Sequence, residues 1–168
     1  PMMSLIKALP AVKAALALAV RLHRPVVPIF WIAGDDHDFI EANHTYFLNR
    51  QGECQRAEYA PQPDSPLPMG KVRLNNTAAL DDSFASICDA LGETEFTGPF
   101  VELLRKCYSP DDTFVTAFGK LMASLTAEYG LVLFSPNDPA VKALARPFFR
   151  EIIMRQDELH SLFVERNQ

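Results

Sequence analysis

Residues 26–44 read VVPIFWIAGDDHDFIEANH, and within them an uncharged apolar run passes directly into a cluster of ionisable side chains. The run from 26 to 33 is rich in β-branched and aromatic residues, which predicts a strand buried on both faces, as in parallel sheets. Pro28 cannot donate a hydrogen bond to a neighbouring strand, so the strand either begins after it or turns this position outward. Gly34 ends the run.

An acidic cluster with one imidazole follows the predicted strand at once, and it consists of Asp35, Asp36, His37 and Asp38. These side chains would lie at the carboxyl end of a buried strand, where open α/β sheets bind their ligands. From Asp38 the pattern predicts a helix, because Asp38 and Glu41 are spaced as a capping pair. Two helical turns span about 7.2 residues, so a helix that begins near His37 would carry His44 on the same face.

The remaining chain predicts helices that alternate with short strands. Residues 2–22 favour a helix, in which Pro10 either introduces a kink or starts a second helix. A short strand is expected at 46–48, paired with 71–74. Residues 61–70 contain four prolines and a glycine, which predicts an irregular loop.

Two helices are predicted at 81–91, capped by Asp81 or Asp82, and at 98–107, so that 81–107 forms a helical insertion. A further helix opens at Asp111 or Asp112, and its apolar stripe is interpreted as core: Phe114, Val115, Phe118, Leu121, Met122, Leu125 and Tyr129. A buried strand at 131–134 then leads into a helix capped by Asp138. The last segment is apolar on one side, with a break expected at Pro147.

Composition narrows the function classes. A chain of 168 residues that is 48% hydrophobic and 22% charged fits one soluble α/β domain. The net charge of -5 and the absence of a Lys/Arg block argue against nucleic acid as a partner. Residues 11–22 are apolar enough to resemble a signal sequence, but the stretch is short, Lys13 interrupts it and no small-residue cleavage site follows, so we expect a buried helix of an α/β domain instead. Three cysteines without CxxC spacing indicate neither a disulfide framework nor a cysteine zinc site, so we expect a cytoplasmic protein.

Two stretches resemble one enzyme family. Residues 24–46, RPVVPIFWIAGDDHDFIEANHTY, resemble the signature of the bacillithiol biosynthesis cysteine-adding enzymes, the cysteine ligases. Residues 128–151, EYGLVLFSPNDPAVKALARPFFRE, are similar to the second Rossmann βα unit of that family. The resemblance implies a Rossmann-like parallel sheet flanked by helices. Because the chain starts without methionine and its first helix lacks a preceding strand, we expect a partial domain covering the early part of a longer enzyme.

The family resemblance also implies substrates and partners. Cysteine and glucosaminyl malate would be the small-molecule substrates, and a coiled coil in the full-length protein would form a homodimer. The cofactor stays open: a nucleotide is compatible with the fold, but the sequence contains no phosphate loop of the G-x-x-x-x-G-K-[ST] type. No membrane contact is implied.

Seven residues are the candidate site. We expect catalysis from His37, His44 and Asp36, since an amine nucleophile must lose a proton to a base that works near pH 7. We expect substrate binding from Asp35, Asp38, Trp31 and Asn43, with a carboxylate for a cationic amine and the Asn43 amide for a carboxylate.

Two other functions remain open from the sequence. One is a metal-dependent hydrolase that uses Asp36, His37 and His44, because carboxylates and imidazoles suit transition metals. No metal ligand is assigned, however, since adjacent residues cannot all point into one coordination sphere. The other is a non-catalytic interaction domain, in which the acidic cluster only stabilises a helix N-terminus.

Overall fold

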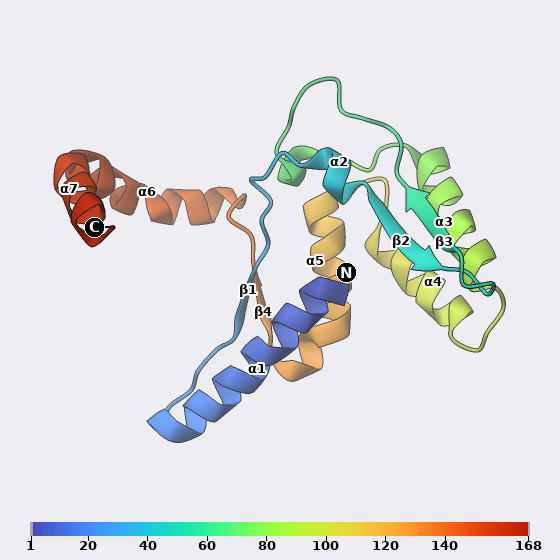
Figure 1. Cartoon of the computed structure of the whole chain (residues 1–168), viewed down its shortest axis with the longest axis horizontal. Coiled ribbons are helices and arrows are strands. Elements are labelled where there is room, and N and C mark those ends of the chain that lie inside the picture. Colours follow the sequence, from blue (N-terminus) through green and yellow to red (C-terminus); the bar gives the residue numbers. More distant parts are fainter. Residues whose placement is uncertain (1, 168) are drawn as a thin grey trace.

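The computed structural model describes residues 2–167 as helices arranged around two small sheets (Figure 1). The elements in chain order are α1 (Met2–Leu22), β1 (Ile29–Trp31), α2 (Phe39–Ala42), β2 (His44–Leu48), β3 (Cys54–Glu58), the 3-10 turn η1 (Met69–Lys71), α3 (Thr77–Leu91), α4 (Thr97–Cys107), α5 (Phe114–Thr126), the 3-10 turn η2 (Ala127–Tyr129), β4 (Val132–Phe134), α6 (Pro139–Met154) and α7 (Gln156–Arg166).

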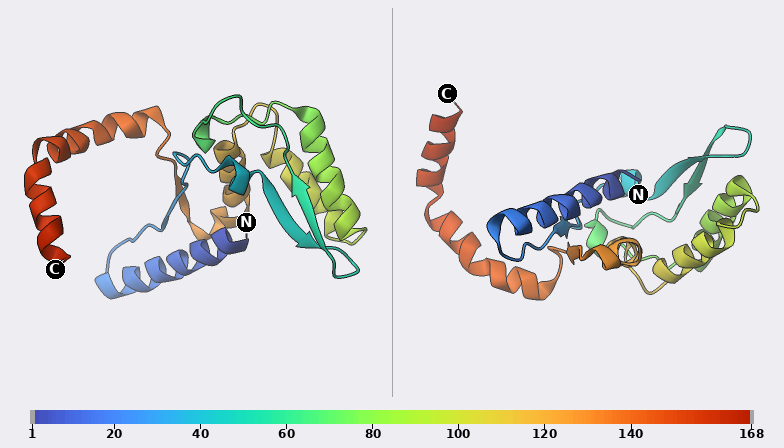
Figure 2. Two further views of the ribbon diagram at one scale, coloured as in Figure 1. Left: turned by 45° about the horizontal axis from the view of Figure 1, so that its top comes forward. Right: turned by 90° about the horizontal axis from the view of Figure 1, so that it is seen from below.

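The first sheet is a parallel pair formed by β1 and β4. Ile29 pairs with Val132, and Trp31 pairs with Phe134. Helix α1 packs beside this pair, where Ala8 and Val12 join a small apolar cluster with residues of α5 and β4 (Figure 2). Strands far apart in sequence therefore meet with their carboxyl ends at one edge, as the α/β prediction requires.

The prediction that 26–33 is a strand buried on both faces is wrong for this chain. The strand begins only after Pro28, which has no N–H to donate to the ladder although its carbonyl accepts from Val132 N at 3.0 Å, and the strand has three residues. Ile29 is 58% exposed and Trp31 is 63% exposed. Their side chains point away from the apolar cluster beside α1, and within residues 2–167 that second face of the sheet is uncovered.

Helix α1 is long and apolar enough, by length and composition alone, to cross a membrane over Met3–Leu22. The core helices of soluble proteins and signal sequences near an N-terminus pass the same test. Ala8, Val12 and Ala15 of α1 are buried, but only 17% of the apolar window is buried, so the expectation of a buried helix is wrong for most of α1. Pro10 lies inside the helix, which continues through it as one element.

The second sheet is the antiparallel hairpin β2–β3, in which His44 pairs with Glu58 and Leu48 with Cys54. The strand predicted at 46–48 is thus present, but its predicted pairing with 71–74 is wrong. Its partner is the segment directly after the turn at 49–52, because closing a short loop costs less entropy than closing a long one. Residue 71 belongs to η1 instead, and Arg73 forms an isolated bridge with Thr113.

Helices α3, α4 and α5 pack against the hairpin and η1 to form the main core, which includes Tyr59, Leu74, Phe84, Leu104 and Leu121. The proline-rich stretch 61–70 has no helix or strand before η1. Helices α3 and α4 occupy the range predicted as a helical insertion. Their status as an insertion stays a prediction.

The residues that cap α3 and α5 differ from the sequence prediction, whereas the cap of α6 agrees with it. Asn76, not Asp81 or Asp82, caps α3, and its Oδ1 accepts from Ala79 N at 3.0 Å. Thr113, not Asp111 or Asp112, caps α5, in a reciprocal pair with Thr116. Asp138 caps α6 as predicted, accepting from Ala140 N at 2.8 Å.

The arm formed by α6 and α7 extends away from the other elements (Figure 1). Pro147 lies inside α6 without ending it, and the break falls at Arg155. The apolar side chains of this arm are exposed, among them Leu144, Phe148, Ile153, Met154 and Phe163.

Candidate functional site

The turn after β1 carries the acidic cluster and is pinned by η1. Gly70 N donates to Gly34 O at 2.8 Å, and Met69 N donates to Asp36 O at 2.7 Å. Gly34 N closes a tight turn on Ile32 O at 2.8 Å. The backbone that presents Asp35 and Asp36 is therefore fixed by a segment more than thirty positions away.

Asp35 connects the first βα unit to the second through hydrogen bonds. Its Oδ1 accepts hydrogen bonds from Asn137 Nδ2 at 2.5 Å and from Lys142 Nζ at 3.2 Å. Asn137 lies in the turn after β4, and Lys142 lies in the second turn of α6. The carboxyl edge of the parallel pair thus combines one carboxylate, one amide and one ammonium group.

Asn137 and Lys142 are residues that the sequence analysis missed. The signal was available in the topology, because Asn137 follows β4 as Asp35 follows β1, and the carboxyl ends of parallel strands share one edge. In this turn the sequence predicted a role only for Asp138, as a helix cap, and the structure confirms that role.

The other members of the acidic turn are exposed. Asp36 Oδ1 accepts from His37 N at 2.8 Å, which uses one carboxylate oxygen to hold the turn. Asp38 occupies the N-cap position of α2 but forms no side-chain hydrogen bond to that helix. The His37 imidazole and the Asp38 carboxylate therefore face solvent beside Asp35 and Asp36.

The predicted helix shared by His37 and His44 does not form. Helix α2 has four residues, and His44 is the first residue of β2. The chain leaves the helix at Asn43, whose carbonyl accepts from Tyr59 N at 2.8 Å and so starts the hairpin ladder. His44 packs edge-on against Tyr46, with 5.2 Å between ring centroids, so its environment is that of a sheet residue.

Asn43 is buried and its amide is engaged inside the protein. It is 4% exposed, and its Nδ2 donates to Glu58 Oε1 at 3.1 Å and to Tyr59 O at 3.3 Å. Its Oδ1 lies 3.0 Å from His44 Nδ1. These bonds tie α2 to the hairpin, while a substrate-binding role for Asn43 stays a prediction.

Trp31 lies on the uncovered face of the parallel pair. Its ring is 4.5 Å from that of Phe134, centroid to centroid, on the neighbouring strand. The indole is therefore a cross-strand partner of Phe134 close to the strand ends that carry Asp35 and Asn137.

The structure does not assemble the metal-binding group of the hydrolase hypothesis. Within residues 2–167, no three His, Cys, Asp or Glu side chains are grouped so that they could hold a metal ion. Asp36 and His37 lie in the turn after β1, whereas His44 lies in the hairpin.

Two hollows lie away from the acidic turn. The larger, about 610 Å³, is open to solvent on one side and is lined mainly by apolar side chains of the hairpin, α3, α4 and α5, with Asn43, His44 and Tyr108 also on its wall. Burial, with a smaller contribution from Cys107, raises the pKa of Tyr108 to about 12, so this hydroxyl stays neutral at physiological pH.

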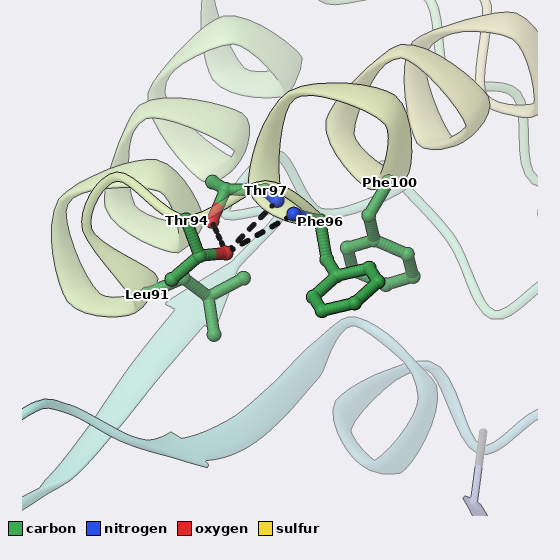
Figure 3. Close-up of a pocket in the computed structure, with 5 residues that line it drawn as sticks. All are labelled: Leu91, Thr94, Phe96, Thr97 and Phe100. Carbon is green, nitrogen blue, oxygen red and sulfur yellow. Dashed lines mark hydrogen bonds between the residues drawn. The ribbon is translucent and has the colours of Figure 1, made fainter.

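The smaller hollow, about 290 Å³, lies at the α3–α4 connection (Figure 3). Thr94 Oγ1 accepts from Phe96 N and Thr97 N there, while the Phe96 and Phe100 rings form one side. These hydrogen bonds stabilise the start of α4. Neither hollow is lined by the acidic turn, whose residues 35–38 are all exposed.

Parallel strands, each followed by a helix, with polar side chains meeting at their carboxyl edge, define a Rossmann-like α/β domain. The chain belongs to the family described as bacillithiol biosynthesis BshC, N-terminal Rossmann-like domain, whose model matches residues 1–168. The resemblance and the fold class expected from the sequence are thereby confirmed.

The chain is similar to longer proteins that carry the name "Putative cysteine ligase BshC". It is 32% identical over 159 residues to the one from Geobacillus kaustophilus, covering 95% of this chain and 29% of that protein. It is 30% identical over 168 residues to the one from Koribacter versatilis, covering 100% of this chain and 30% of that protein. The chain thus spans less than a third of the length of these relatives.

Proposed function

We propose that this chain is the N-terminal part of a ligase that joins cysteine to the amine of glucosaminyl malate in bacillithiol biosynthesis. The family and the names of its relatives support a small-molecule ligase. The structural observation that carries the proposal is the meeting of Asp35, Asn137 and Lys142 at the carboxyl edge of the parallel pair.

In this proposal, Asp35 binds the α-ammonium group of cysteine. An exposed carboxylate on a pinned turn is a suitable anchor for a cation, and Lys142 beside it offers the opposite charge to a carboxylate of a substrate. The two groups together complement a zwitterion. Anchoring cysteine in this way places its carboxyl group at the strand edge, next to the His37 turn.

Amide formation then needs an activated cysteine carboxyl group and a neutral amine. The amine nitrogen of glucosaminyl malate attacks the carboxyl carbon, the C–N bond forms, and the leaving group departs with its electron pair. His37 takes the proton that the nitrogen loses, since an exposed imidazole can exchange protons near pH 7. Asp36, next in the chain, is proposed to hold the turn that presents His37, since its Oδ1 accepts from His37 N at 2.8 Å, and Asp38 is proposed to contribute to substrate binding.

The wider context of the proposal follows from the family resemblance. We propose that the full-length protein is a homodimer held by a coiled coil and works in the cytoplasm. The open face at Trp31 and the exposed arm α6–α7 support the view that further chain completes the domain, because parallel sheets are normally covered on both faces.

The test is a mass-spectrometric assay for the cysteinyl product with cysteine and glucosaminyl malate. The full-length ligase carrying this domain should form the product, whereas residues 1–168 alone should form none. In the full-length protein, Asp35→Asn should raise KM for cysteine by about tenfold or more, since it removes a charged partner. An unchanged KM in that variant would refute the anchoring role.

A further inference from the structure

We propose that Asn137 is the positioning residue of this site: its amide, held between Gly34 and Gly70, fixes the Asp35 carboxylate in the orientation that receives the substrate ammonium group. The inference rests on the proposed function of Asp35. It adds a residue from the second βα unit that acts on the substrate only through Asp35.

The first observation is the space that two glycines leave for Asn137. A Cβ at Gly70 would lie 2.5 Å from Asn137 Oδ1 and 2.6 Å from its Cγ, and a Cβ at Gly34 would overlap the same amide oxygen. Neither glycine has the positive φ that favours glycine in turns. Close approach of side chains, rather than backbone conformation, is therefore the reason for glycine at both positions: Asn137 alone at Gly70, and Asn137 together with Val115 Cγ2, at 2.9 Å, at Gly34.

The second observation is that the walls of this space are fixed independently of Asn137. The turn after β1 and η1 are joined by Gly70 N to Gly34 O, at 2.8 Å, and by Met69 N to Asp36 O, at 2.7 Å. A planar amide between two such walls has little freedom to rotate. Its orientation is set by the backbone of two distant segments.

The third observation is how the amide is used. Asn137 Oδ1 is buried and has no hydrogen-bond partner among the described residues, whereas Nδ2 donates to Asp35 Oδ1. A buried acceptor without a partner is unfavourable, so a position that retains one needs another reason. Donation to Asp35 from a fixed direction supplies that reason.

The fourth observation concerns Asp35 itself. Both of its donors, Asn137 Nδ2 and Lys142 Nζ, reach Oδ1, and within residues 2–167 no hydrogen bond reaches Oδ2. Oδ2 is thus the atom presented to a ligand. Lys142 is a long side chain that is 56% exposed, so the rigid contribution comes from Asn137.

The decisive variant is Asn137→Asp in the full-length ligase. Aspartate has the shape of asparagine and still fits between the glycines, but it places a carboxylate oxygen where Nδ2 donates. We expect KM for cysteine to rise by about tenfold, the equivalent of about 1.4 kcal/mol, while kcat stays within about twofold. Asn75→Asp, at an exposed position, controls for the added charge and should leave both constants unchanged.

Exchanging the side chains at positions 35 and 137 distinguishes a positioning role of Asn137 from a role in folding. The double variant D35N/N137D restores a donor and an acceptor that face each other, so its Tm should return to the parental value while KM for cysteine stays high. Should Asn137→Asp fail to fold, Asn137→Ala provides the same KM measurement, because it removes the donor and leaves the walls in place.

The outcomes distinguish this inference from the function on which it rests. If Asp35→Asn raises KM but neither Asn137 variant does, the positioning role is refuted and the anchoring role stands. If the Asn137 variants lower only Tm, Asn137 is structural and the inference is wrong. If Asp35→Asn itself leaves KM unchanged, the proposed function fails and the inference fails with it.

Discussion

Lys142 Nζ lies 3.2 Å from Asp35 Oδ1, although 107 positions separate the two residues in the sequence. Their side chains are 56% and 54% exposed, and exposed ion pairs contribute little to folding. Lys142→Met should therefore change the free energy of unfolding by less than about 1 kcal/mol in urea titrations. In the full-length ligase the same variant should raise KM for cysteine. A large loss of stability with normal kinetics would assign the pair a structural role.

Gly70→Ala should destabilise the chain, because the added Cβ meets the Asn137 side chain at 2.5 Å. We expect a loss of about 1–3 kcal/mol in urea unfolding, typical of overpacking. Combining it with Asn137→Ala should recover most of that loss. The matched control is Gly98→Ala in α4, where nothing lies within 4 Å of the added Cβ and helix propensity favours alanine. Equal losses at both glycines would contradict the steric explanation.

Asp112 should make stability depend on acid pH. Burial opposes ionisation of its carboxyl group, but hydrogen bonds from Lys120, Thr116 and Ser109 outweigh it and hold the pKa below its ordinary value. The stabilisation is therefore present above the unfolded pKa of about 3.9 and is lost as pH falls through the lower, folded pKa.

Asp112→Asn should accordingly cost about 1–2 kcal/mol in urea unfolding at pH 7 and much less at pH 3. Asp111→Asn, at the exposed neighbouring position, should show little loss at either pH. A loss from Asp112→Asn that is the same at both pH values would exclude the carboxylate as the cause.

His37 and His44 should respond differently to substitution. His37 is exposed beside Asp35 and Asp36, so His37→Gln in the full-length ligase should lower kcat by about 10² to 10⁴ without affecting Tm. His44 contacts Asn43 and Tyr46, so His44→Gln should lower Tm first. Product formation and thermal unfolding are measured for both. The reverse pattern would transfer the base to His44, and normal turnover in both variants would remove the base from the mechanism.

Trp31 is the only tryptophan of the chain, which makes its fluorescence a probe of the open sheet face. In residues 1–168, acrylamide quenching should approach that of the urea-unfolded chain, because the indole is 63% exposed. Phe134→Ala should increase quenching further, since Phe134 shields one side of the ring. In the full-length ligase we expect Trp31 to be protected. Protection already in the short chain would mean that this face is covered by its own residues.

The sequence was sufficient to predict the α/β class and the position of the acidic turn. Both depend on local patterns: an apolar run that ends at Gly34, and a cap at Asp138 that marks the second βα unit. The apolar stripe predicted for α5 was correct in part: Leu121 and Met122 are buried, whereas Leu125 and Tyr129, at the end of the stripe, are exposed.

The features that could not be predicted from the sequence depend on contacts between distant segments. His44 was predicted on a helix because local spacing favours one, but the ladder that begins between Asn43 and Tyr59 prevails. Asn137 and Lys142 were not predicted as site residues, because they contact Asp35 only when β4 pairs with β1. Gly34 and Gly70 likewise have no positive φ, and glycine at these positions is explained by side chains from distant segments: Asn137 at both, and Val115 also at Gly34.

The order of the strands has a consequence for how the domain folds. β1 and β4 pair directly, so joining them closes a loop of about a hundred residues, and contacts of such long range form late. Every residue of the main core cluster lies between Phe39 and Leu121, inside that loop. The intervening unit can therefore collapse first and bring its two ends together. The edge that holds Asp35 and Asn137 would then be the last part of the domain to assemble, and the first to separate under denaturant.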